Sequence, residues 1–297
     1  SSAPKQHYLP SKVTSLSDGT PAEPSDGLFP TSLLSLIFSF MPSDSDEIKP
    51  SSDAIVSEYL ALETMNHERA DQLLLEYINS NSPLCLDEMP DQKLYDFFSR
   101  KKDEIYTLTL SGKTMPENLI IELKSKCPNL KRLKIICDSF YQSVSELDRL
   151  THLEIISKFF EQPVEKLKNL QHLVIKSILF NQPLRELNNL TYLEIDNENF
   201  NQPIEQLKNL RHIKLNCWEF NHPVEELENA THLEISSNSF NRPMEKLSKL
   251  TYLKIDSLPF NQPVEMLEQL KYFEIKNHCF NHPIEKLIKR GTKCVLT

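Results

Sequence analysis

Phenylalanine recurs every 20 residues through the second half of this chain. The recurring positions are Phe140, Phe160, Phe180, Phe200, Phe220, Phe240, Phe260 and Phe280. Three further apolar columns keep the same register and begin at Leu147, Leu153 and Ile155. A fixed period of this length predicts a solenoid, in which each repeat buries its apolar face against its neighbours. Solenoids present long open surfaces, so the pattern favours a binding protein.

Each repeat also contains the pattern expected of one short strand. Leu210, Ile213 and Leu215 follow the spacing LxxLxL. Side chains alternate across a strand, so Ile213 and Leu215 should face the core while His212 and Lys214 face outward. A 20-residue repeat is too short to add a full helix, so turns or single helical turns should form the opposite side.

The predicted fold class is α+β, with N-terminal helices followed by a solenoid that carries a parallel β-sheet. Residues 1–27 have no apolar period and are expected to form a disordered or loosely docked tail. Residues 28–104 are expected to form a helical domain, and residues 105–137 a longer first repeat that caps the core. The 20-residue units then fill residues 138–297, ending in a short closing strand or cap. Helices are expected over residues 54–66, 70–78, 94–100 and 119–126.

Composition disfavours several classes of function. The net charge of −9 argues against a nucleic acid or an anionic membrane as the main partner. The chain has only 4 glycines and no glycine-rich phosphate loop, and no apolar run is long enough to cross a membrane. No catalytic triad or carboxylate pair stands out from the repeats. We therefore expect no enzyme activity, no catalytic residue, no cofactor and no metal.

The six cysteines are expected to be reduced, partly buried thiols. None forms a CxxC pair, and rungs of a solenoid are about 4.8 Å apart, so Cys217 and Cys279, three rungs apart, should not meet. The opening residues carry no signal-peptide pattern. These observations favour a cytoplasmic location.

An outward column of histidine and tyrosine is the strongest candidate for a binding site. Its members are His152, His172, Tyr192, His212, His232, Tyr252 and Tyr272. Interchange with tyrosine and the lack of a third ligand disfavour a metal site. A stacked surface ladder and a ligand-contact stripe both fit; we prefer the stripe, because such side chains are favoured at protein interfaces. The expected partner-binding residues are Tyr192, His212, His232 and Tyr252, with Glu194, Lys214, Glu234 and Lys254 two residues further on. As exposed side chains, they should contribute little to stability.

A column of asparagines is expected to be structural. Its members are Asn181, Asn201, Asn221, Asn241, Asn261 and Asn281. Buried asparagines in a solenoid bond loop backbone groups of their own rung and the next, so we expect burial here.

The repeat resembles a short leucine-rich repeat and, more specifically, the FNIP repeats, whose mark is Phe-Asn-x-Pro-[Ile/Leu]. Six units carry it, as FNQPL, FNQPI, FNHPV, FNRPM, FNQPV and FNHPI. The two earliest units, at Phe140 and Phe160, lack the asparagine. The resemblance covers about half the chain and implies a solenoid that binds another protein.

Residues 28–42 resemble the first helix of an F-box. The resemblance implies that this helix binds a Skp-family adaptor through Leu28, Pro30, Leu33, Leu34, Ile37, Phe38 and Met41. Residues 59–67 resemble the third-helix run of the family, but Glu63 and His67 stand where the family prefers apolar and aromatic residues. FNIP repeats of amoebal and giant-virus proteins often follow an F-box, and this chain has that order.

Together these resemblances imply the substrate-recognition subunit of an SCF-type ubiquitin ligase, which holds an unknown protein substrate on the strand face of the solenoid. A variant of this hypothesis is a pathogen or viral protein that uses the ligase of its host in the host cytosol. The alternative is a leucine-rich-repeat scaffold without a role in ubiquitin transfer, in which residues 28–42 form a core helix of the N-terminal cap.

Overall fold

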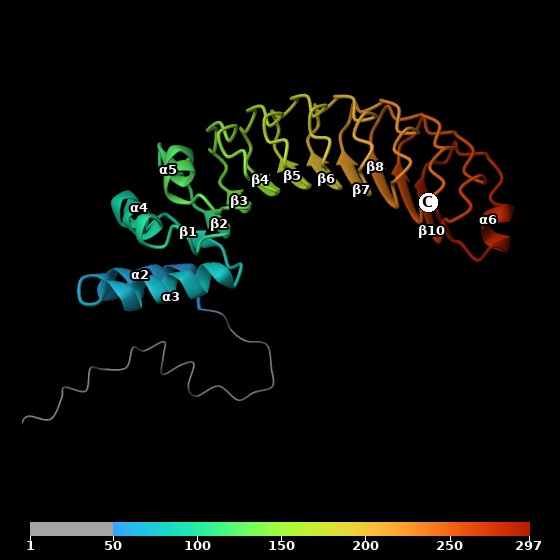
Figure 1. Ribbon diagram of the computed structural model, residues 1–297. Helices are drawn as coiled ribbons and strands as arrows, with labels where there is room; N and C mark the ends of the chain where they lie inside the picture. Colours follow the sequence, from blue (N-terminus) through green and yellow to red (C-terminus); the bar gives the residue numbers. More distant parts are fainter. Residues whose placement is uncertain (1–49) are drawn as a thin grey trace, which may run out of the picture. The chain divides into compact units, whose positions relative to one another are not determined.

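The computed structural model describes residues 50–297, which form one compact unit (Figure 1). Its helices are α2 (Ser52–Glu63), α3 (His67–Asn79), α4 (Asp91–Arg100), α5 (Leu119–Lys126) and α6 (Glu285–Lys289). Its strands are β1 (Leu84–Cys85), β2 (Thr107–Ser111), β3 (Arg132–Ile136), β4 (His152–Ile156), β5 (His172–Lys176), β6 (Tyr192–Asp196), β7 (His212–Asn216), β8 (His232–Ser236), β9 (Tyr252–Asp256), β10 (Tyr272–Lys276) and β11 (Lys293–Leu296). The expected tail and all seven expected adaptor-binding residues lie outside the described residues.

The eleven strands form one parallel sheet in chain order, as the 20-residue period predicts. Neighbouring strands pair in register, so that Leu193 lies beside Ile213 and Ile195 beside Leu215. Figure 1 shows the strands along the concave side of the arc made by residues 50–297, with the turns on the convex side. The predicted inward face is confirmed, because Ile213 and Leu215 are buried while His212 and Lys214 are half-exposed.

The phenylalanine column forms a spine within the core. Its rings stack in two runs, Phe140 to Phe200 and Phe220 to Phe280, with centroids of neighbours 5.8–6.2 Å apart. Every ring from Phe140 to Phe260 is buried, and only Phe280, in the last rung, is half-exposed. Each repeat therefore depends on its neighbours for burial, as in other solenoids.

A buried polar column that the sequence analysis missed fixes the turn beside this spine. It consists of Ser157, Ser177, Asn197, Ser237, Ser257 and Asn277, with cysteine at positions 137 and 217. The hydroxyl of Ser177 donates to the carbonyl of Phe160 (2.7 Å), and Ser237 makes the same bond to Phe220 (2.9 Å). These bonds satisfy carbonyls that would otherwise be buried without a donor. A small polar residue every 20 positions was the signal in the sequence.

The asparagine column is structural, but the expected burial is wrong. Asn181, Asn201 and Asn241 are exposed, and the other members are exposed or half-exposed. The side-chain oxygen of Asn181 accepts from the backbone N–H of Asn201 (3.1 Å), and Asn221, Asn241 and Asn261 repeat this bond to the next rung. The amide can remain in water because it needs to reach only one backbone donor.

Helices α2, α3 and α4 cover the first end of the sheet and are joined by buried charges. Arg100 makes a bidentate pair with Asp71 (2.7 and 2.9 Å) and bonds the hydroxyl of Tyr59 (3.1 Å). Glu63 is buried and accepts from Lys93. Glu63, the position at which the F-box resemblance fails, thus has a structural role here. The predicted boundary between the helical domain and the first repeat, at residue 104, stays a prediction. Strand β1 lies before this boundary but belongs to the same sheet as the strands after it.

The helices predicted within residues 50–297 and the predicted closing strand correspond to helices and a strand of the structure. Helix α5 has the predicted bounds, and the predicted closing strand is β11. All six cysteines are free thiols, as predicted, but Cys279 is exposed rather than partly buried, because it lies in the turn after β10. Among residues 50–297, no helix has the length and hydropathy needed to cross a bilayer.

Candidate protein-interaction surface

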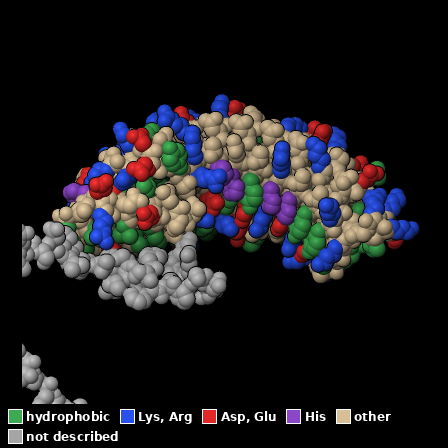
Figure 2. Space-filling view, turned by 60° about the horizontal axis from the view of Figure 1, so that its bottom comes forward, with side chains coloured by type: hydrophobic (Ala, Val, Ile, Leu, Met, Phe, Trp, Pro, Cys, Tyr) green, Lys and Arg blue, Asp and Glu red, His purple; other side chains and the backbone are tan. Residues whose placement is uncertain are grey.

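The outward side chains of β4–β10 form a continuous surface, called here the strand face. Figure 2 shows its histidines as a purple row beside mixed red and blue side chains. The eight predicted partner-binding residues all lie on it, in two adjacent columns over β6–β9. Parallel in-register pairing brings them together, because it places equivalent residues of successive repeats side by side.

The histidine and tyrosine rings stack into one ladder along the sheet. Ring centroids are 5.4 Å apart for His152 and His172, and 3.9–4.6 Å apart for each following pair as far as Tyr272. The ladder ends where Lys293 lies 5.7 Å from the Tyr272 ring. The structure thus shows the stacked ladder that was one of the two open interpretations; binding by the same side chains stays a prediction.

This stacking changes the expected contribution of the ladder to stability. The rings are half-buried rather than freely exposed. Tyr192 stacks against His172 on one side and His212 on the other, and an aromatic contact contributes roughly 0.5–1.5 kcal/mol beyond burial. The expectation that replacing these side chains would barely affect stability therefore understates their role.

The second column pairs its charges across and along the strands. Glu194 accepts from Lys176 (3.0 Å) and from the Tyr192 hydroxyl (3.0 Å), and lies 3.6 Å from Lys214. The same arrangement recurs where Glu274 binds Lys254, and Glu234 binds His232. Most charged groups of the strand face thus already have a partner within the protein.

Burial and neighbouring charges shift the pKa values of several side chains on the strand face. Burial is the main cause that lowers the pKa of His152 and of His212, and the neighbouring histidine adds to the effect. A hydrogen bond from His172, with help from Lys134, lowers the pKa of Glu154 to about 2. Burial and the Glu194 carboxylate raise the pKa of Tyr192 to about 12. These pKa shifts favour the neutral form of His152 and His212 and the ionised form of Glu154.

We expect the protein to lose stability as the pH falls from about 7.5 to 5.5. The folded-state pKa of His152 and His212 lies below the unfolded value of 6.5, so their contribution is present above pH 6.5 and is lost as the pH drops toward the lowered values. Glu154 adds a further loss only between about pH 4.5 and 2. Melting temperatures across this range should fall for the native protein and fall less for His152→Gln/His212→Gln. A melting temperature that is constant or rises toward pH 5.5 would contradict the account.

The imidazoles do not form a metal site in the described part of the chain. No group of three or more His, Cys, Asp or Glu side chains there is placed to hold an ion. The neighbours His152 and His172 instead stack through their rings.

The strand face carries a shallow depression, with a volume of about 340 Å³. It extends over β5–β9 and is lined by members of the charged column, including Glu194, Lys214, Glu234 and Lys254. Its lining combines the ion-paired Glu194 and Lys214 with polar side chains such as Asn216, so it suits the contour of a protein surface better than a small apolar ligand.

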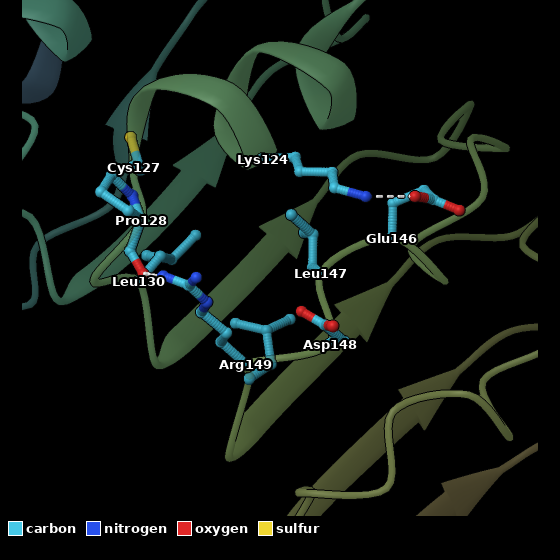
Figure 3. A pocket seen from close by; sticks show the side chains of 9 residues that line it. Lys124, Cys127, Pro128, Leu130, Glu146, Leu147, Asp148 and Arg149 are labelled. Carbon is cyan, nitrogen blue, oxygen red and sulfur yellow. Dashed lines mark hydrogen bonds and ion pairs between the residues drawn. The ribbon is translucent and has the colours of Figure 1, made fainter.

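Another cavity, of about 220 Å³, lies between α5 and the turn before β4 (Figure 3). An ion pair between Lys124 and Glu146 crosses it, and Leu147 and Arg149 lie on the side of the turn. The gap arises because α5 is a helix whereas the next repeat has only a turn at this place. It is a mismatch in stacking, and Lys124, Glu146 and Arg149 on its walls already have partners within the protein.

A row of exposed apolar side chains, not predicted from the sequence, lies beside the strand face. They lie two or three residues past the ends of β4–β9, on an edge called here the rim. Its apolar members are Phe159, Ile178, Leu179, Trp218 and Leu258. The signal in the sequence that could have indicated them is the presence of apolar residues at repeat positions that are polar in the other repeats.

Comparison with known proteins identifies the fold but no closer relationship. The sequence matches no protein-family model and no curated protein sequence. A solved structure of a leucine-rich repeat protein of Leptospira interrogans is similar, with a TM-score of 0.50 and 20% identity, over 70% of this chain and 57% of that chain. This chain thus spans a little over half of that protein. The likeness shows a parallel-sheet solenoid of the leucine-rich-repeat type.

Proposed function

We propose that this protein is the substrate-recognition subunit of an SCF-type ubiquitin ligase. The observation that carries the proposal is the order of two features: an F-box-like sequence at residues 28–42 precedes a solenoid with FNIP-type repeats. The leucine-rich-repeat fold supports the second half of the proposal, because such a solenoid offers a long surface to a protein partner.

In this function the chain contributes position rather than chemistry. Residues 28–42 bind a Skp-family adaptor, and the strand face around Tyr192, His212, His232 and Tyr252 binds the target protein. Holding both on one chain raises the effective concentration of target lysines near a separately bound conjugating enzyme. No catalytic residue of its own is needed. The proposal places the protein in the cytosol, which is the host cytosol if the chain comes from a pathogen or a virus.

The charge pattern of the strand face suggests what kind of target it accepts. Its carboxylates and amines are paired with each other, so a partner gains from them only by presenting its own mixed charges in the complementary order. The aromatic ladder then supplies the rigid contact area at the centre.

Replacing Leu33 and Ile37 by Asp should abolish binding to the adaptor. Two carboxylates in an apolar interface each cost several kcal/mol if they remain charged. Binding of a purified Skp-family adaptor to the full chain is measured by calorimetry, with Ser32→Asp/Ser35→Asp as a control that adds the same charge at polar positions of the segment. The circular dichroism spectrum of the repeats should not change, because solenoid stability is local. Adaptor binding that survives the Leu33 and Ile37 double substitution would show the F-box assignment to be wrong.

The alternative is a protein-interaction scaffold with no link to ubiquitin. One observation favours it: α2, α3 and α4 close the first end of the sheet through the Glu63, Asp71 and Arg100 network, which is the role of a structural cap. In that case the native chain gives no heat with the adaptor, while the strand face still binds its partner.

A further inference from the structure

The large apolar side chains of the rim are exposed, whereas the rings of the strand face are half-buried. The exposed fractions are 50% for Ile178, 51% for Trp218 and 62% for Leu258, and Leu179 adds to the first of these. Ile178, Trp218 and Leu258 occupy one repeat position, two residues past the ends of β5, β7 and β9. Because the strands pair in register, the three side chains follow one line along the edge of the sheet.

The spacing of this line is regular. Every second rung contributes an apolar side chain, and strands are about 4.8 Å apart, so successive anchors are roughly 10 Å apart. A polyproline-II segment advances about 9.3 Å in three residues and returns each third side chain to the same side. An extended segment with an apolar residue at every third position therefore matches the line.

Acids without an ion-pair partner lie beside Trp218: Asp196 and Glu198 on the rung between Ile178 and Trp218, and Glu219 on the rung of Trp218 itself. Asp196, Glu198 and Glu219 are exposed, and none lies in an ion pair among residues 50–297. Asp196 accepts only from the side-chain amide of Asn216 (2.8 Å). Lys176, which lies beside Asp196 on the neighbouring strand, is already bound to Glu194. The rim around Trp218 thus has negative charge without internal compensation.

The rim and the strand face differ in the new contacts that they offer to a partner protein. The rings of the strand face are stacked and its charges are paired, so a partner must exchange existing contacts there. On the rim, apolar side chains and carboxylates face water, and both gain from contact with a partner that carries apolar and cationic groups. Nucleic acids and anionic membranes would be repelled.

We propose that the rim is a second docking surface, which binds an extended segment of another protein with apolar side chains at every third position and Lys or Arg between them. Trp218 is the central anchor, and the cations beside it are bound by Glu198, on the preceding rung, and by Glu219, next to Trp218 on its own rung. The inference goes beyond the proposed function, since it requires neither the adaptor nor the ladder.

Trp218 is the only tryptophan of the chain, so its fluorescence reports on the rim alone. The probe is a synthetic peptide with Lys-Pro-Leu repeated four times, titrated into the full chain at low salt. We expect saturable binding, a shift of the Trp218 emission to shorter wavelength, and reduced quenching by acrylamide. The matched peptides Glu-Pro-Leu and Lys-Pro-Ser, which lack the cation or the apolar anchor, should not produce the shift.

Two charge-reversal variants of equal net change test the site. Glu198→Lys/Glu219→Lys should weaken binding of the Lys-Pro-Leu peptide by about tenfold or more. Glu245→Lys/Glu268→Lys, at exposed positions of the turns that precede β9 and β10, should leave it within about twofold. The proposal is overturned if the Lys-Pro-Leu peptide leaves the Trp218 emission unchanged, if both variants weaken binding equally, or if the Glu-Pro-Leu peptide binds as tightly.

Discussion

Phe240→Ala is expected to lower the free energy of unfolding by roughly 3–5 kcal/mol, as other large core truncations do. Phe240 is fully buried and stacks on both sides, with Phe220 at 6.1 Å and Phe260 at 6.0 Å. Removal of the ring leaves a cavity that neighbouring rungs cannot fill, because strand pairing fixes their spacing. The change is measured by urea denaturation followed by circular dichroism.

Phe280→Ala provides the matched comparison. This ring belongs to the same column but is half-exposed, and Phe260 is its only stacked neighbour in the spine, at 6.2 Å. Its removal should cost clearly less, about half as much by the number of stacked neighbours. Equal losses at the two positions would be inconsistent with a solenoid whose rungs bury each other in sequence.

Arg100→Met should also cost roughly 3–5 kcal/mol, through an electrostatic mechanism. The Asp71 side chain is 3% exposed and loses both of its bonds to the guanidinium, while the Tyr59 hydroxyl loses one. A buried carboxylate without a partner must either remain charged at high cost or take up a proton. We expect the variant to have a lower unfolding midpoint than the native protein at neutral pH. The difference between the two midpoints should become smaller at acidic pH.

The double variant Arg100→Met/Asp71→Leu separates this mechanism from loss of packing. It removes both charges, so most of the stability should return. If the double variant is as unstable as Arg100→Met alone, loss of packing around Arg100 causes the destabilisation and the unpaired charge does not.

The solenoid could be predicted in detail from the sequence because equivalent positions of successive repeats lie in the same environment and so carry similar residues. Ile213 and Leu215 belong to columns that are apolar in each repeat, so the strand and its inward face were predicted correctly. Helix α5 could be predicted in the same way from a local apolar pattern. Periodicity identifies what is buried, since burial imposes the same requirement on each rung.

The side-chain contacts on the surface could not be predicted in the same way. Stacking of Tyr192 on His212 depends on ring rotamers, and the amide of Asn181 can bond the next rung while exposed. The Asp71–Arg100 pair joins residues 29 positions apart outside the repeats, where no period signals it. Trp218 was missed because its repeat position is apolar only in every second rung, so the column as a whole is not an apolar one.

In the proposed function, adaptor and target bind to separate surfaces of one chain. Amide hydrogen exchange tests this most directly. Exchange is measured on the full chain with and without a purified Skp-family adaptor. The account predicts protection within residues 28–42 and unchanged exchange in β6–β9, where the strand face presents Tyr192 to Tyr252. Protection of β6–β9 without protection of residues 28–42, or no protection anywhere, would contradict it.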